Sequence, residues 1–162
     1  AVIEAGVDVM AHTVAGAPVY APEQLARFKQ QGIALIPTLS LFAKLPVGPD
    51  VAARLVASTV AQVKAFSDNG GAVLFGTDVG FTTIYDTTLE YELMRRALSE
   101  RQILASLTSG PAQYFKAATK GRVEKGLDAD LVVLDGDPVA DVSNLARVAY
   151  TIRAGKMIYS KP

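Results

Sequence analysis

Short apolar runs alternate with longer amphipathic segments over the first half of the chain. The runs at 7–10, 33–39 and 72–75 have the length and the flanking turn residues of buried strands. Between them, segments 22–31 and 51–67 carry apolar residues at helical spacing. Strands and helices that alternate in this order predict a parallel sheet with crossover helices, either in a barrel or in a doubly wound sheet.

Local signals predict where several helices begin and end. Pro22 suits the first turn of the first helix, and Gly32 suits its end. Asp50 is predicted to cap the second helix. Ser99 and Gln102 have the spacing of a capping box, which predicts a further helix directly after Ser99.

The character of the chain changes near residue 119. Beyond it, short β runs are separated by turn signals, and Ala154-Gly155 predicts the turn of a hairpin. We therefore predict two parts, an α/β part at residues 1–118 and a small all-β part at 119–162. The shorter predicted elements are helices at 89–98 and 111–118 and strands at 131–134, 148–153 and 156–159.

The composition is that of a folded domain. Half of the 162 residues are apolar, and 16 basic residues balance 16 acidic ones, a balance that gives no footprint for nucleic acid or an anionic membrane. No apolar run approaches the roughly 18 residues of a membrane span. Cysteine is absent, which excludes disulfides and thiolate metal sites and permits a reducing compartment, so we favour a cytoplasmic location.

Two side chains with metal-binding chemistry follow predicted strands. His12, the one histidine of the chain, follows the first strand, and Asp78 follows the third. Catalytic groups of parallel α/β folds gather at the carboxyl edge of the sheet. Imidazole and carboxylate suit zinc, iron or manganese, and a carboxylate can relay the proton of an activated water. Each residue alone also has a structural interpretation, as a hydrogen-bonded histidine and as a turn or cap aspartate.

Other polar clusters favour structural roles. In the all-β part, four closely spaced aspartates lack the ligand order of a calcium loop, so we predict that they cap and turn a small sheet; they are Asp128, Asp130, Asp135 and Asp137. Because the chain has a single histidine, a serine-hydrolase triad is not predicted. The charged residues of the helical region, predicted to form a solvated face, are Glu90, Glu92, Arg95, Arg96, Glu100 and Arg101.

Four segments of the chain, taken in order, resemble the sequence motifs of a known protein family. They are AGVDVMAH at 5–12, GIALIPTL at 32–39, GAVLFGTD at 71–78 and GRVEKGLDADLVVLDGDP at 121–138. In this order they resemble the C-terminal half of the amidohydrolase superfamily, in the branch of imidazolonepropionase-like and Xaa-Pro dipeptidase-like enzymes. The first three are similar to the family's sixth, seventh and eighth barrel strands. The last is similar to its return from the barrel to a small β-sandwich domain.

The resemblance implies both a fold and a chemistry. The fold would be the C-terminal part of a TIM-like (β/α)8 barrel, about strands six to eight, followed by strands of the small β-sandwich. His12 would bind a divalent metal, with zinc favoured and one or two ions in the complete enzyme. Asp78 would contact metal and water and pass a proton to the leaving nitrogen of an amide, cyclic amide or dipeptide-like substrate. Val79 and Gly80 would face that substrate.

The sequence also departs from the family pattern. Ala11 and Thr13 stand where family members often carry Glu and Gly beside the strand-six histidine. The family's ligands from strands one, four and five have no counterpart, and a closed barrel needs about 200 residues or more.

Since the chain begins at Ala1 without Met, as though partway through a helix, we expect a piece of a longer protein, inactive alone. We expect it to self-associate or to pair with a missing N-terminal half. The alternative is a non-catalytic barrel fragment that serves in binding or assembly.

Overall fold

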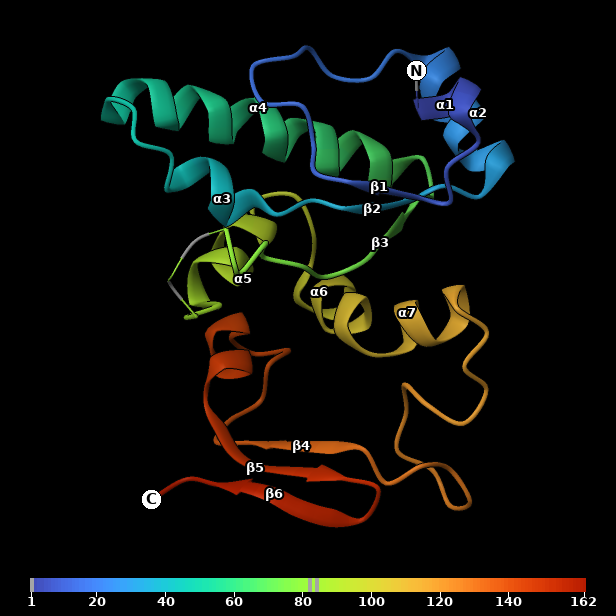
Figure 1. The fold of residues 1–162 in the computed structure, drawn as a ribbon, viewed down its shortest axis with the longest axis vertical. Coiled ribbons are helices and arrows are strands. Elements are labelled where there is room, and N and C mark those ends of the chain that lie inside the picture. The colour runs from blue at the N-terminus through green and yellow to red at the C-terminus, as the bar shows by residue number, and fades with distance from the viewer. Residues whose placement is uncertain (1, 82, 84) are drawn as a thin grey trace.

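Two three-stranded sheets organise the chain, one parallel and one antiparallel (Figure 1). The computed structural model describes residues 2–81, 83 and 85–162, so Ala1 lies outside the described residues. The parallel sheet has the order β1-β2-β3, which confirms the predicted parallel arrangement. Its strands are β1 (Val9–Ala11), β2 (Ala34–Ile36) and β3 (Ala72–Val73), and those of the antiparallel sheet are β4 (Leu131–Leu134), β5 (Val148–Arg153) and β6 (Lys156–Ser160).

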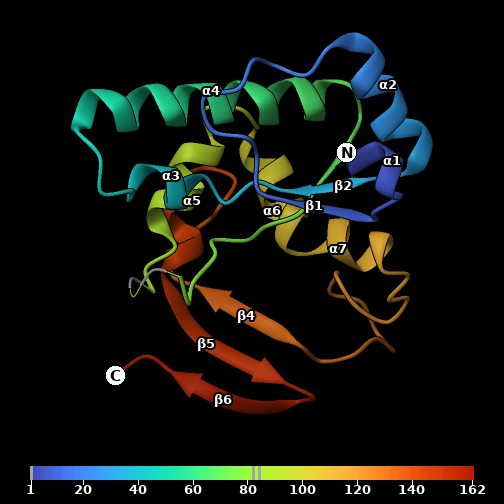
Figure 2. The same ribbon diagram turned by 45° about the horizontal axis from the view of Figure 1, so that its top comes forward.

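Helices cover both faces of the parallel sheet. The long helix α4 (Pro49–Asp68) lies across one face, whereas α6 (Glu100–Leu107) and α7 (Ser109–Tyr114) lie on the other (Figures 1 and 2). The antiparallel sheet lies beyond α6 and α7 in both views. The remaining helices are α1 (Val2–Ala5), α2 (Pro22–Gln31), α3 (Leu39–Ala43), α5 (Thr88–Met94) and the 3-10 helix η1 (Val142–Ala146).

One hydrophobic core joins these layers. Leu35 of β2 and Val63 of α4 are fully buried, and Phe66 packs beside them at the end of α4. Full burial of a side chain of this size contributes about 1.5–3 kcal/mol. Val142 of η1 belongs to the same cluster, so the C-terminal segment packs onto the α/β part. The division at residue 118 stays a prediction.

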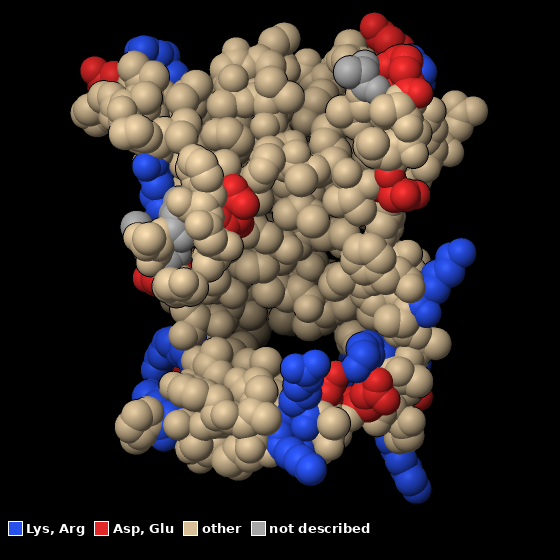
Figure 3. Space-filling view, viewed as in Figure 1, with Lys and Arg blue, Asp and Glu red and all other residues tan. Residues whose placement is uncertain are grey.

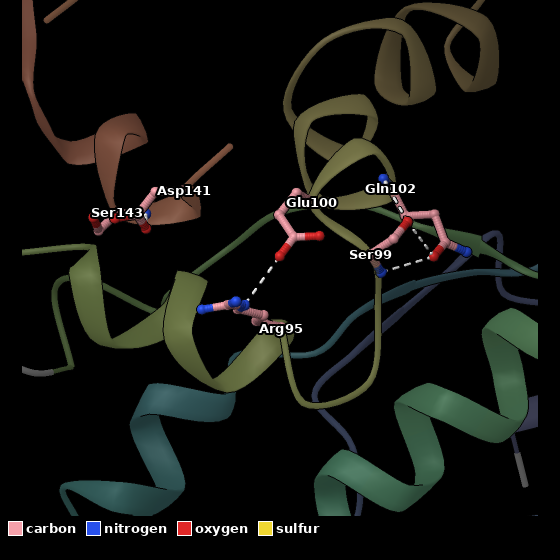
Figure 4. A network of polar contacts seen from close by, with 6 residues as sticks. All are labelled: Arg95, Ser99, Glu100, Gln102, Asp141 and Ser143. Atoms are coloured by element: carbon pink, nitrogen blue, oxygen red, sulfur yellow. Dashed lines mark hydrogen bonds and ion pairs between the residues drawn. The ribbon is translucent and has the colours of Figure 1, made fainter. Parts of the chain in front are cut away.

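The capping signals give a mixed result. Ser99 and Gln102 form the predicted capping box at the start of α6, with the Ser99 main-chain N–H donating to Gln102 Oε1 at 2.9 Å (Figure 4). The prediction for Asp50 is wrong. Pro49 is the first residue of α4, so Gly48 occupies the cap position and Asp50 lies in the first turn.

Several predicted helices and strands are longer than the observed ones, and the strand predicted at 33–39 keeps only Ala34–Ile36. The helix predicted at 89–98 ends at Met94, because the next hydrogen bonds, such as Arg96 N–H to Leu93 O, tighten into turns. The helix predicted at 111–118 spans Ser109–Tyr114 and is followed by Lys116, whose φ of 56° is incompatible with continuing it. The strand predicted at 72–75 keeps only Ala72–Val73.

Asp130 has the structural role that was predicted for the aspartates of the C-terminal part. Asp130 Oδ1 accepts from the Ala154 N–H at 2.8 Å and so fixes the hairpin turn. Lys120 pairs with both Asp128 and Asp130, and its ammonium holds the pKa values of these two carboxyls below their usual range. Figure 3 shows side chains of both signs, mostly around the edges of the face and over the antiparallel sheet.

None of the helices in the described part of the chain combines the length and the apolar character that a membrane crossing requires.

Candidate functional site

The strands of the parallel sheet lead to three residues with unusual backbone conformations. His12 follows β1, Thr38 follows β2 and Asp78 follows β3, with φ angles of 71°, 50° and 57°. Left-handed conformations are uncommon for residues other than glycine and cost about 1–3 kcal/mol each. Parallel strands end at one edge of a sheet, and His12 and Thr38 follow β1 and β2 closely there, whereas β3 ends at Val73, well before Asp78.

The half-buried His12 is held by the neighbouring strand. Its main-chain N–H donates to Ile36 O at 2.9 Å, which extends the pairing of β1 with β2 by one step. Its ring Nδ1 lies 2.6 Å from Thr38 Oγ1. Thr38 is 3% exposed, and its Oγ1 also lies 2.8 Å from Pro37 O. His12 therefore contacts the end of β2 through both its main chain and its imidazole ring.

Asp78 is half-buried and begins a turn in which the Phe81 N–H donates to Asp78 O at 3.2 Å. The chain that leads to it passes close to β2. A Cβ atom added to Gly76 would lie 2.4 Å from Ile36 Cγ2, so only glycine fits this approach. Ile36 thus contacts the segments that carry both predicted ligands. No hydrogen bond joins His12 to Asp78 within residues 2–81.

Val79 and Gly80 follow Asp78 on the surface. Val79 is 39% exposed, and Gly80 is exposed with a φ of 121°. Their predicted contact with substrate stays a prediction.

Glu90 contradicts the predicted solvated face. It is fully buried in α5, and its Oε1 and Oε2 accept from the N–H groups of Leu39 and Ser40 at 2.9 and 2.7 Å. Burial raises the pKa of the Glu90 carboxyl, while the two N–H groups act in the opposite direction. A sequence signal for this burial exists, because Glu90 shares its helix face with Leu93 and Met94, whereas Glu92 lies on the exposed side.

A second buried polar side chain fixes the loop after β1. Gln62 of α4 is fully buried. Its Oε1 accepts from the Val14 N–H at 2.9 Å, and its Nε2 donates to Val14 O at 2.8 Å. Gln62 thus makes two hydrogen bonds to the main chain of Val14, which comes two residues after His12. Sequence reasoning did not identify Gln62, since nothing in the helical spacing reveals its partner.

The chemistry of the donors fits part of a metal site. A neutral imidazole and a carboxylate are both zinc ligands, but catalytic zinc commonly uses three protein ligands plus water. No group of three or more His, Cys, Asp or Glu within the described residues is arranged to hold a metal. A hollow of about 520 Å³ is lined by Gly71, Val73 and Gln102, among others, and does not include His12 or Asp78.

Comparisons with known proteins identify the family of the chain. The sequence profile of the Amidohydrolase family matches residues 4–159. A search of curated proteins found no match.

Solved structures match over nearly the whole chain. A Xaa-Pro dipeptidase with methionine bound in its active site superposes with a TM-score of 0.80 and 24% identity, over 98% of this chain and 41% of that one. A Bifidobacterium longum protein described as a prolidase gives 0.81 and 28%, over 97% and 43%. The A. niger ochratoxinase gives 0.75 and 21%, over 98% and 38%. The chain therefore spans less than half the length of each of these proteins.

The likeness to these structures supports the α/β fold, and the profile match extends over almost every residue. The chain therefore belongs to the amidohydrolase family.

Proposed function

We propose that this chain contributes the C-terminal part of the active site of a metal-dependent hydrolase that cleaves carbon–nitrogen bonds. One observation carries the proposal. The segments that resemble the family's metal-binding strands lead, in a chain matched by the family profile over 4–159, to His12 directly after β1 and to Asp78 in the segment that follows β3. Membership of a family of hydrolases supports the reaction class.

His12 and Asp78 would hold a divalent ion, with zinc favoured, together with ligands from outside this chain. When bound, the ion supplies Lewis acidity that polarises the scissile carbonyl and acidifies a water. Asp78 then acts as the general base, since a carboxylate in contact with that water accepts its proton and delivers it to the leaving nitrogen. The left-handed backbone of Asp78 and the close approach of Gly76 to Ile36 restrict the backbone that carries this carboxylate, which supports the proposed role.

The substrate class that we propose is a dipeptide-like amide, with cyclic amides as the neighbouring class. The matches to a Xaa-Pro dipeptidase and to a protein described as a prolidase support the dipeptide-like choice. Val79 and Gly80 would lie beside the substrate, because they follow Asp78 directly and are exposed.

The test is hydrolysis of a panel of dipeptides and cyclic amides by an enzyme that carries this chain. Such an enzyme can be made by joining the chain to the N-terminal part of the Bifidobacterium longum protein. We expect Asp78→Asn to lower kcat by about 10²–10⁴-fold, the usual contribution of a general base. His12→Asn should lower both zinc content and activity.

Asp68→Asn provides the matched control. Asp68 is an exposed aspartate at the end of α4 whose pairing with Lys64 has little energetic weight. Unchanged activity is expected for this variant. If Asp78→Asn hydrolysed the same substrates within a few-fold of the parent, the assigned role of Asp78 would be wrong.

We further propose that the isolated chain self-associates or pairs with an N-terminal half. The parallel sheet of the described residues has β1 and β3 at its edges, and unpaired edges favour association. The antiparallel sheet also carries exposed apolar side chains, which mark interaction surfaces when they are contiguous. They are Val132, Val133, Tyr150, Met157, Ile158 and Tyr159. Light scattering that shows a stable, compact monomer would contradict this proposal.

A further inference from the structure

We propose that Thr38 is a positioning residue for His12, which keeps the imidazole proton on Nδ1 and leaves Nε2 free to bind a metal, and that Glu90 holds Thr38 in place. The consequence for metal binding rests on the proposed function, whereas the position of the proton can be measured without any metal.

The two contacts of Thr38 Oγ1 determine which atom carries the ring hydrogen of His12. Thr38 Oγ1 lies 2.8 Å from Pro37 O and 2.6 Å from His12 Nδ1. A hydroxyl has one hydrogen, and a carbonyl oxygen can only accept. The Thr38 hydrogen therefore goes to Pro37 O, and Oγ1 accepts the hydrogen of His12 Nδ1. In a neutral imidazole the proton on Nδ1 leaves Nε2 with its lone pair, the form in which histidine binds a metal.

The next step concerns the backbone that carries the hydroxyl. Thr38 has φ 50° and ψ 48°, a left-handed conformation that is especially unfavourable for a β-branched residue. The chain must be held there by its surroundings. Directly after Thr38, the N–H groups of Leu39 and Ser40 both point to the buried carboxylate of Glu90. Glu90 thus fixes the start of α3 and, with it, the direction of the Thr38 side chain.

Together these contacts connect three elements that are far apart in the sequence. Glu90 of α5 holds the start of α3, Thr38 at that start holds the ring of His12, and His12 follows β1. Thr38 and Glu90 are 3% and 0% exposed, and their side-chain oxygens form hydrogen bonds within the protein. Their role is to orient the ligand.

The single histidine makes a direct test possible. Long-range ¹H–¹⁵N NMR spectra of the ring-labelled chain, recorded with the ring in its neutral form, distinguish the two tautomers of one residue without overlap. We expect the parent chain to carry its proton on Nδ1. Thr38→Val keeps the β-branched shape and removes the acceptor, so the Nε2–H form should become the major one. Thr38→Ser keeps the hydroxyl and should retain the Nδ1–H form.

Glu90→Gln should shift the tautomer ratio in the direction of Thr38→Val, while Glu92→Gln, an exposed change in the same helix, should leave it unchanged. Amide spectra of each variant establish that the fold is retained. The proposal is overturned if the parent carries its proton on Nε2, a result that needs no variant at all. It is equally overturned if a folded Thr38→Val chain keeps the parent's ratio.

In the assembled enzyme, Thr38→Val should lower zinc affinity by about 10–100-fold, the usual effect of losing such a partner, and Thr38→Ser should restore it. Zinc affinity is measured by competition with a chromogenic chelator, independently of turnover. Unchanged affinity in Thr38→Val would refute the positioning role. If the enzyme binds no zinc while the parent shows the Nδ1–H form, the proposed metal-dependent function fails and the proton assignment stands.

Discussion

The buried carboxylate of Glu90 offers a stringent test of this interpretation through the variant Glu90→Ala. Its two oxygens satisfy the N–H groups of Leu39 and Ser40, which are 0% and 3% exposed. Alanine removes both acceptors. Each buried N–H left without a partner costs about 1–3 kcal/mol.

Two further effects act in opposite directions. The truncated side chain leaves a cavity at a fully buried position of α5, which destabilises the fold further. Removal of a buried charge recovers its desolvation penalty, several kcal/mol for an ion in a protein interior. The unpaired N–H groups and the cavity outweigh this recovery, and we expect the free energy of unfolding to fall by about 3 kcal/mol.

The assay is urea unfolding followed by far-UV circular dichroism at one fixed protein concentration, since association would change the apparent stability. With a slope of about 2 kcal/mol per molar urea, the transition midpoint should fall by about 1.5 M. Glu92→Ala is the control, because Glu92 is exposed in the same helix. If Glu90→Ala and Glu92→Ala unfold within about 0.5 kcal/mol of each other, the carboxylate does not stabilise the start of α3.

Three further outcomes are expected. Burial raises the pKa of Glu90, so its carboxyl contributes most stability below its unfolded-state pKa of about 4.3. This contribution is lost as pH rises through the raised pKa of the folded state. The difference in urea midpoint between the parent and Glu90→Ala should therefore be larger at about pH 4 than at about pH 8. Gly71→Ala places a Cβ 2.3 Å from the ring of buried Phe66 and should cost about 1–3 kcal/mol in thermal unfolding, whereas Gly48→Ala, with open space around it, should cost little. After extensive dialysis, elemental analysis of the isolated chain should find well under one zinc per chain; near-stoichiometric zinc in a monomer would contradict the two-ligand count.

The sequence predicts the elements that depend on neighbours close along the chain. The spacing of apolar residues gave α4, and the Pro22 and Gly32 signals gave both ends of α2. The Ser99–Gln102 capping box and the hairpin turn at Ala154-Gly155 were predicted in the same way. These features form because each is stabilised by contacts within a few residues, which one stretch of sequence contains in full.

Element ends were less predictable. Asp50 has the side chain of a helix cap, yet the fixed φ of Pro49 lets α4 begin at Pro49, with Gly48 as its cap. Likewise, the apolar run at 72–75 pairs with β2 only at Ala72–Val73, because Phe75 already donates its N–H to Ser106 O of α6. Such ends depend on which of two possible partners a residue contacts, and the local sequence indicates only one of these partners.

By itself, the sequence determined the alternation of strands and helices, the resemblance to the amidohydrolase family, and His12 and Asp78 as the residues with the appropriate chemistry. Only the tertiary structure decided that Thr38 meets the ring of His12 and that Glu90 is buried rather than solvated. These contacts join residues 26 and 50 or more positions apart. Whether a polar side chain faces water or a buried N–H group depends on which helix face packs inward, and that is settled when the layers of the fold come together.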